Sequence, residues 1–475
     1  MEDKQGQLVR SLGLFSVFLL TVSSTVGSGI YKKVGPMSAD LGSPSLVIIC
    51  WILAGLISIC GALSNAEVAG MLADSGGEYA YFKKIYNKFF AFLVGWANFT
   101  AIRSASAASV GYVFAMSFNS IVPLPELPDS IASISVFGIF TPFDNFGVKG
   151  FTILLIVGLS CVHYAGVKFG DGLNKIVTLV VITSIVLVII LGLTLGDGSW
   201  ANFQTPAAGY VDQPWWSGSF VKLIFMAMLS AFWAYEGWSS VGYLGGEIKN
   251  ANKTLPLALI MGVFFVMLIY CTINFTYLYI LPIDTIIDTQ NNSKNTIAAV
   301  VVVEHFLGNA GMLFMLLVIA LTTFGSTNAT LMTPPRMYYA MAKEGLFFKG
   351  AAYIHPKYNT PSTALVYQAV IASVLVLSGT FDQLTDMLVF ASFIVYGATA
   401  VGVFVLRYKM PDAHRPYKVW GYPVVPAIFI AFCITLIVIT IISKPREALL
   451  GLGAIASGIP FYLYWTRKRR DDVKR

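Results

Sequence analysis

Charged side chains are scarce in this sequence. Only 12% of the 475 residues are Asp, Glu, Lys or Arg, whereas 56% are hydrophobic. Soluble domains carry about 25% charged residues, because their surfaces face water. The scarcity excludes a soluble globular protein and indicates a chain that lies mostly in lipid.

Paired cysteines and clustered histidines are also missing. The five cysteines all fall inside long apolar stretches: Cys50, Cys60, Cys161, Cys271 and Cys433. No C-x-x-C pair occurs, so we expect neither a disulfide framework nor a cysteine metal site. The four histidines lie in different segments, without a second ligand at metal-ligand spacing: His163, His305, His355 and His414. We therefore expect no metal and no cofactor and, because no acid/base constellation converges, no enzyme.

Long apolar runs take the place of charged surface. A helix needs about 20 apolar residues to cross the hydrocarbon core of a bilayer. We predict about twelve transmembrane helices, over residues 12–34, 43–72, 88–119, 150–167, 173–196, 219–249, 255–281, 297–341, 362–380, 384–407, 424–443 and 448–466. The links are too short for a soluble domain, and the first run lacks a signal-cleavage site and is expected to remain. The predicted fold class is an all-α polytopic membrane protein.

The positions of Lys and Arg predict the orientation of the chain. With a cytoplasmic N-terminus, most of the 31 Lys and Arg residues fall in cytoplasmic loops and tails. The opposite side holds only Lys32, Lys33, Lys149, Lys294, Lys444 and Arg446, and Arg103 and Lys222 fall inside spans. Both termini are therefore expected in the cytoplasm. The net charge of +7 reflects this topology and an attraction to anionic membrane lipid, and no nucleic-acid partner is expected.

The loop after the second span carries four charged residues. They are Asp74, Glu78, Lys83 and Lys84. Charges in a short loop between two spans are most simply solvated. We expect all four to form an exposed cytoplasmic face.

Two of the predicted spans contain residues that favour a break in the helix. The first reads TVSSTVGSGI at 21–30, and the sixth reads FWAYEGW at 232–238, with Glu236 near its middle. Unwound backbone persists at membrane depth only where it is buried in protein or lines a cavity. A carboxylate there is costly and is a functional candidate by default. GSG alone could equally serve close helix packing, but the second break favours a site between the two.

The two breaks occupy corresponding positions in two halves of five helices. Because five is odd, the halves have opposite orientations in the membrane, which is the inverted-repeat arrangement of secondary transporters. The expected segments are a cytoplasmic N-terminus at 1–11, five-helix repeats at 12–196 and 219–407 joined by an extracytoplasmic loop at 197–218, two additional helices at 408–466, and a basic cytoplasmic tail at 467–475.

Five motifs in order resemble one transporter family. They are VGSGIY at 26–31, FWAYEGW at 232–238, GGEIKN at 245–250, the stretch FGSTNATLMTPPRMYYAMAKEG followed by HPKYNTPS, and LRYKMPDAHRPYKVWGYPVVP at 406–426. Together they resemble the amino acid-polyamine-organocation (APC) superfamily of permeases, and within it the L-type amino acid transporter (LAT) branch and its bacterial relatives. The resemblance implies a ten-helix inverted repeat followed by two helices.

The resemblance also implies a function. We expect sodium-independent transport of neutral L-amino acids by alternating access, with exchange of one amino acid for another. The alternative is a proton- or cation-coupled symporter on the same scaffold. A more distant alternative is a non-transporting sensor or a membrane enzyme. The preferred amino acid and the oligomeric state are left open.

The breaks suggest how each end of an amino acid is held. Backbone N–H groups freed at Gly27, Ser28 and Gly29 suit the carboxylate. Carbonyls freed before the breaks would meet the ammonium group, with Glu236 as a further partner: Val22, Ser23, Thr25, Phe232 and Trp233. The resemblance implies that Trp233 is an aromatic gate and that Phe393 is a pocket aromatic, although both could be ordinary core residues.

Coupling depends on a few polar positions. Glu236 could bind the ammonium group, carry a proton or hold neighbouring helices together. For Arg103 we favour a structural pairing. Family members often have a lysine in the fifth helix where this sequence has Val181, and Lys175 lies nearly two turns away. The hydroxyl and amide groups of the eighth span could still coordinate a cation: Ser326, Thr327 and Asn328.

The partner implied by animal members of the family is not expected here. They bind a glycoprotein through a cysteine between the third and fourth helices, whereas residues 117–150 contain none. We therefore expect no disulfide-linked ancillary subunit. This absence and the short loops favour a prokaryotic inner membrane.

Overall fold

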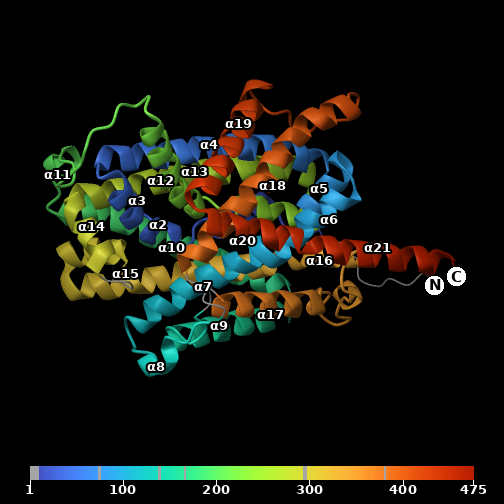
Figure 1. Cartoon of the computed structure of the whole chain (residues 1–475), viewed down its shortest axis with the longest axis horizontal. Helices are drawn as coiled ribbons and strands as arrows, with labels where there is room; N and C mark the ends of the chain where they lie inside the picture. The colour runs from blue at the N-terminus through green and yellow to red at the C-terminus, as the bar shows by residue number, and fades with distance from the viewer. Residues whose placement is uncertain are drawn as a thin grey trace.

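Helices make up the fold of the described chain (Figure 1). The structure, a computed structural model, describes residues 10–72, 76–136, 141–164, 167–292, 297–378 and 381–474. Most of the long helices run along the longest axis of the molecule, side by side (Figure 1). Within the described residues there is no sheet, and an isolated bridge joins Leu12 to Ile248. The predicted all-α class is confirmed, whereas most of the expected N-terminal segment, up to residue 9, lies outside the described residues.

Eight helices of the described chain are long and apolar enough to cross a membrane. They lie in α4 (Pro44–Met71), α9 (Phe146–Tyr164), α10 (Val167–Leu195), α13 (Ala251–Ile280), α15 (Ala298–Met332) with α16 (Pro335–Lys343), α18 (Phe381–Lys409), α19 (Val424–Ser443), and α20 (Pro445–Ala456) with α21 (Gly458–Lys474). This confirms a polytopic membrane protein. The count of twelve spans stays a prediction.

The other predicted spans are shorter or divided helices. Three are short and apolar: α1 (Leu14–Thr25), α12 (Gly218–Ala234) and α17 (Ser362–Ser378). The third predicted span consists of α6 (Lys88–Ala97), a π-turn (Asn98–Ile102) and α7 (Arg103–Asn119). Shorter helices connect these elements: α5 (Glu78–Ile85), α8 (Asp129–Ala132), α11 (Trp200–Gln204), α14 (Ile283–Asn292) and a 3-10 turn (Lys349–Ala352).

The first predicted break is present. Helix α1 ends at Thr25, and the chain resumes as α2 (Gly29–Lys32) and α3 (Val34–Leu41). Val26 after α1 has extended backbone angles. A Cβ atom on Gly29 would lie 2.5 Å from the Cα atom of Ala234 in the other broken helix. Only glycine allows this approach of the two backbones.

The second break is also present, and it changes the expected course of the sixth span. Helix α12 ends at Ala234, and the chain continues as two 3-10 turns, Trp238–Tyr243 and Gly245–Glu247. After the break, the span predicted to reach residue 249 therefore continues as 3-10 turns and not as an α-helix, because glycines at 237, 242, 245 and 246 lower the helix propensity. Gly237 has φ +115°, and a Cβ atom on it would lie 2.0 Å from the Ser24 carbonyl oxygen.

A tyrosine of α13 ties the two breaks together. The Tyr270 hydroxyl lies 3.0 Å from the carbonyl oxygen of Thr25 and 2.8 Å from that of Ala234. These carbonyls end α1 and α12, so the last residues of both helices share the single hydroxyl proton of one side chain. Tyr270 is fully buried. The two breaks are thus one structural unit.

Two buried ion pairs account for motifs that are distant in sequence. Glu67 of α4 accepts from Arg407 at 2.9 and 2.7 Å and from the backbone N–H of Val419 at 2.7 Å, which attaches the LRYKMPDAHRPYKVWGYPVVP loop. Glu247 of the GGEIKN motif pairs with Arg336 of the TPPR stretch at 3.0 Å. Each carboxylate is nearly inaccessible. These motifs therefore hold together segments that are distant in the sequence.

Candidate functional site

A small polar cavity lies where the two breaks meet. It is lined by Ser24, Thr25, Gly27, Ser28, Gly29, Ser106, Val110, Trp233, Glu236 and Ser326. Its volume is about 10 Å³, which is room for about one water molecule. The structure is therefore closed around the site, and an amino acid can enter only if the lining moves apart.

Hydrogen-bond donors without acceptors gather at this cavity. Within the described residues, the backbone N–H groups of Gly27, Ser28 and Gly29 have no acceptor. The Ser28 hydroxyl and the Trp233 indole N–H are buried and also have no partner. Buried polar groups are normally paired, so a group of unpaired donors indicates a missing acceptor. A carboxylate, which accepts several hydrogen bonds at once, fits this set.

The carbonyls proposed for the ammonium group are partly occupied. The Val22 carbonyl accepts from the N–H of Val26 at 2.7 Å. That of Trp233 accepts from the N–H of Glu236 at 3.3 Å, and that of Thr25 from the Tyr270 hydroxyl. A carbonyl oxygen has two lone pairs, so each of these can accept one further hydrogen bond.

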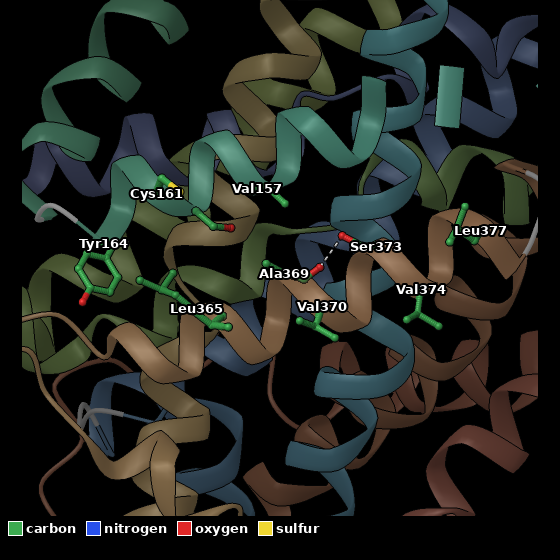
Figure 2. A pocket seen from close by; sticks show the side chains of 11 residues that line it. Val157, Cys161, Tyr164, Leu365, Ala369, Val370, Ser373, Val374 and Leu377 are labelled. Carbon is green, nitrogen blue, oxygen red and sulfur yellow. Dashed lines mark hydrogen bonds between the residues drawn. The ribbon is translucent and has the colours of Figure 1, made fainter. Parts of the chain in front are cut away.

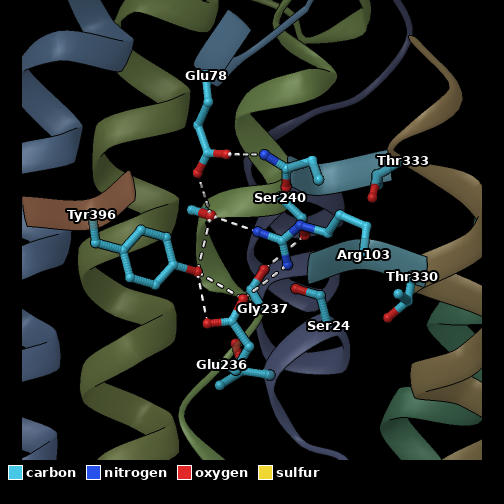
Figure 3. Close-up of polar contacts among 12 residues, drawn as sticks. Ser24, Glu78, Arg103, Glu236, Gly237, Ser240, Thr330, Thr333 and Tyr396 are labelled. Carbon is cyan, nitrogen blue, oxygen red and sulfur yellow. Dashed lines mark hydrogen bonds and ion pairs between the residues drawn. The ribbon is translucent and has the colours of Figure 1, made fainter. Parts of the chain in front are cut away.

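Glu236 belongs to a buried polar network (Figure 3). Arg103 lies 3.1 Å from a carboxylate oxygen of Glu236 and donates to the Ser239 hydroxyl at 2.9 Å. The Tyr396 hydroxyl of α18 lies 2.8 Å from both carboxylate oxygens of Glu236. Figure 3 shows Arg103 and Tyr396 converging on this carboxylate from different helices. The same carboxylate lines the cavity, so the network adjoins the site.

A second carboxylate in the network was missed from the sequence. Glu78 of α5 is 1% exposed, so the prediction that it is solvated was wrong. It accepts from the hydroxyls of Tyr243 at 2.8 Å and Ser239 at 3.0 Å, and from the Asn98 amide at 3.1 Å. These partners are neutral. The network thus holds two carboxyl groups and the single guanidinium of Arg103 among its described members.

Trp233 is covered by an aromatic residue that the sequence analysis also missed. Phe381, at the start of α18, packs edge-on against Trp233 with ring centroids 5.9 Å apart. The Nζ atoms of Lys32 and Lys33 lie 4.1 and 5.0 Å from the centroid of the same ring. Cations at this distance are attracted to the face of an aromatic ring. A layer of one phenylalanine and two lysines therefore adjoins Trp233 at this end of the cavity.

Several predicted site residues lie beside the cavity rather than on its wall. Phe393 packs edge-on against Phe232 with ring centroids 4.5 Å apart. Val181 of α10 is 5% exposed, and the Thr327 hydroxyl donates to the Thr323 carbonyl of its own helix at 2.7 Å. The predicted residues that do not line the cavity are Val22, Ser23, Phe232, Phe393, Val181, Thr327 and Asn328.

Of the three polar residues proposed in the eighth span, Ser326 alone lines the cavity. The Asn328 amide is buried without a hydrogen-bond partner, while its backbone carbonyl lies 3.0 Å from Nε2 of His163. Within the described part of the chain, no three His, Cys, Asp or Glu side chains are grouped so that they could hold a metal ion.

Comparison with known proteins identifies the family. Residues 12–459 match the model of the amino acid permease family. The chain is 29% identical to the human b(0,+)-type amino acid transporter 1, over 97% of this chain and 89% of that protein. It is 27% identical to the serine/threonine exchanger SteT of Bacillus subtilis (strain 168), over 99% of this chain and all of that protein.

A third relative is the human large neutral amino acids transporter small subunit 2. It is 29% identical, over 97% of this chain and 82% of that protein. The resemblance seen in the sequence motifs is thus confirmed, and the apolar helices show an integral membrane protein. This chain belongs to the amino acid permease family, whose matched members are transporters.

Proposed function

We propose that this protein carries neutral L-amino acids across a membrane by alternating access, as a sodium-independent exchanger. The observation that carries the proposal is the group of unpaired donors where the two broken helices meet. Five buried donors, from Gly27, Ser28, Gly29 and Trp233, face one small cavity between two helix breaks. Matched relatives that are named as amino acid transporters support the same reading.

Each end of the substrate has its own set of partners in this proposal. The carboxylate takes the backbone N–H groups and the Ser28 hydroxyl. The ammonium group takes the second lone pairs of the carbonyls at the ends of α1 and α12. Every α-amino acid has these two groups, so these contacts recognise amino acids as a class. Selectivity among amino acids then depends on the contacts of the substrate side chain. The rest of the cavity lining includes Ser106, Val110 and Ser326, and this favours substrates with small side chains.

Alternating access needs a closure on each side of the cavity. In the proposed topology, Trp233 with Phe381 closes the outer side, and the Arg103 network closes the cytoplasmic side. The two closures share α18, which supplies both Phe381 and Tyr396. Opening one while the other stays formed would expose the substrate to one side at a time. Glu236 adjoins the substrate and also closes the cytoplasmic side.

The finer organisation is part of the same proposal. It has twelve spans, arranged as a five-plus-five inverted repeat and two further helices, with both termini in the cytoplasm of a prokaryote. Contact between the first and sixth predicted spans at their breaks supports the repeat. The absence of cysteine from residues 117–150 supports a transporter that works without a disulfide-linked subunit.

The experiment is uptake of labelled amino acids into proteoliposomes, without sodium and without a pH gradient. Vesicles preloaded with unlabelled amino acid should take up label, and empty vesicles should not. Ser28→Trp fills the cavity and should abolish this uptake. Ser130→Trp, in an exposed segment, controls for the added ring. Full uptake in Ser28→Trp would count against the site.

One observation favours a second candidate, a proton-coupled symporter. The buried network has two carboxyl groups for one guanidinium, so one carboxyl could hold an exchangeable proton. Empty vesicles would then accumulate substrate when a proton gradient is imposed. Glu78→Gln and Glu236→Gln, compared over pH, would show which carboxyl responds. If neither substitution changed the pH dependence, the network would carry no coupled proton.

A further inference from the structure

A hollow separate from the transport cavity lies beside α21, the last described helix. It has a volume of about 670 Å³. Its lining includes the aromatic residues Phe348, Tyr367, Phe461 and Trp465 and the lysines Lys349 and Lys468. These residues come from α21, from α17 and from the segment between α16 and α17. None of the residues that line the transport cavity takes part.

The aromatic side chains form one continuous wall. Phe348 packs against Tyr367 with ring centroids 5.6 Å apart and against Trp465 at 5.3 Å. Phe461 lies 5.6 Å from Trp465. Phe348 and Phe461 are each 38% exposed, so the wall is open on its outer side. An exposed apolar wall between transmembrane helices is covered by lipid in a membrane.

The charge of the hollow is of one sign. Among the side chains that the structure describes, its lining contains two lysines and no carboxylate. Lys468 also lies over the ring of Tyr464, with Nζ 5.9 Å from the centroid. Aromatic residues gather at the level of the lipid headgroups, and basic pockets between helices at that level bind anionic headgroups. The lysines thus match the anionic headgroup of a lipid, and the aromatic rings match its acyl chain.

We propose that this hollow binds one anionic phospholipid, from the leaflet on the side where α21 ends. The phosphate lies between Lys349 and Lys468, and an acyl chain follows the wall formed by Phe348 and Phe461. Charge complementarity selects a lipid over a transmembrane helix, because the apolar face of a helix would leave two cations unpaired. The lipid would join α21 to α17 and to the segment before it.

Two other hollows of the described chain show why charge is needed for this inference. One lies between α9 and α17, where Figure 2 shows Val157 and Cys161 facing Leu365 and Ala369. The other lies between α5, α6 and α18, beside Tyr86 and Ala398. Neither lining contains a charged residue. Nothing in them distinguishes one lipid from another.

Native mass spectrometry of the delipidated protein in detergent tests the proposal. Phosphatidylglycerol and phosphatidylcholine with identical acyl chains are added in separate titrations. Wild type should bind one phosphatidylglycerol in preference to phosphatidylcholine. The double variant Lys349→Gln/Lys468→Gln should bind phosphatidylglycerol roughly 30-fold more weakly, since each lysine near a lipid surface contributes about a factor of five.

The matched control is Lys343→Gln/Lys357→Gln, which removes the same charge from two exposed lysines outside the hollow. It should bind phosphatidylglycerol as wild type does. Equal binding of both lipids by wild type would overturn the proposal. So would unchanged phosphatidylglycerol binding in the Lys349→Gln/Lys468→Gln variant, or an equal loss in the control, which would indicate diffuse charge attraction. Because all four lysines are exposed, the variants are expected to fold.

Discussion

Replacing Arg103 by glutamine would leave Glu78 and Glu236 buried together without their cation. The guanidinium lies 3.1 Å from Glu236, and their side chains are 2% and 4% exposed. Removing one partner of a buried ion pair destabilises a protein by about 3–5 kcal/mol. We therefore expect Arg103→Gln to lower the apparent midpoint of thermal unfolding strongly and to abolish transport.

A double-substitution cycle separates this electrostatic cost from the loss of a side chain. In Arg103→Gln/Glu236→Gln, one of the two uncompensated carboxylates is also removed. The double variant should be more stable than Arg103→Gln alone, although it carries one substitution more. Thermal unfolding of the four purified proteins in detergent, followed by intrinsic fluorescence, gives the comparison. The Glu236→Gln substitution keeps an amide oxygen as an acceptor for the Tyr396 hydroxyl, so that contact is preserved.

The reasoning fails if the changes in unfolding free energy caused by Arg103→Gln and by Glu236→Gln are additive in the double variant. Residues in one ion-pair network should show a coupling of about 0.5–3 kcal/mol, whereas independent residues add within about 0.5 kcal/mol. An additive double variant would mean that Arg103 does not stabilise Glu236. A stable Arg103→Gln protein that has lost only substrate affinity would instead assign Arg103 to substrate binding.

Three further predictions concern other parts of the structure. Gly237→Ala should abolish transport and reduce the yield of folded protein, because the φ of Gly237 is +115° and the added Cβ atom would lie 2.0 Å from a carbonyl oxygen. The control is Gly453→Ala, which should behave as wild type because no atom lies within 4 Å of the added Cβ atom. Phe381→Ala removes the ring that covers Trp233, so labelled substrate already bound should dissociate faster, measured as the off-rate by filtration; an unchanged off-rate would remove Phe381 from the outer closure. Glu67→Gln weakens two hydrogen bonds to Arg407 and should lower the unfolding midpoint without changing the KM for transport, and a changed KM would link this contact to the site.

Some features follow from local chemistry and were predictable. An apolar composition excludes a soluble fold regardless of which residues contact one another. The membrane class and the helix at 424–443 could therefore be predicted without knowing the tertiary structure. Glycines placed beside polar groups within a span lower helix propensity locally, which located both breaks. The same local chemistry predicted a site at these breaks, and the structure brings Gly27, Ser28, Gly29 and Trp233 to one cavity there. Ser106 and Val110 lie in a span whose sequence gave no sign of a break, so nothing marked them.

By itself the sequence determined the membrane class, the family and the positions of the two helix breaks, because these depend on composition and on residues adjacent in the chain. Only the tertiary structure decided which distant groups meet. Glu78 lies in a charged segment that resembles a solvated loop. Packing of α5 nevertheless buries Glu78 beside residues that are distant in the sequence. Tyr270 and Phe381 resemble any aromatic residue in an apolar helix until folding brings them to the breaks. Such contacts depend on how helices pack, and an apolar pattern specifies that a face is buried without specifying its partner.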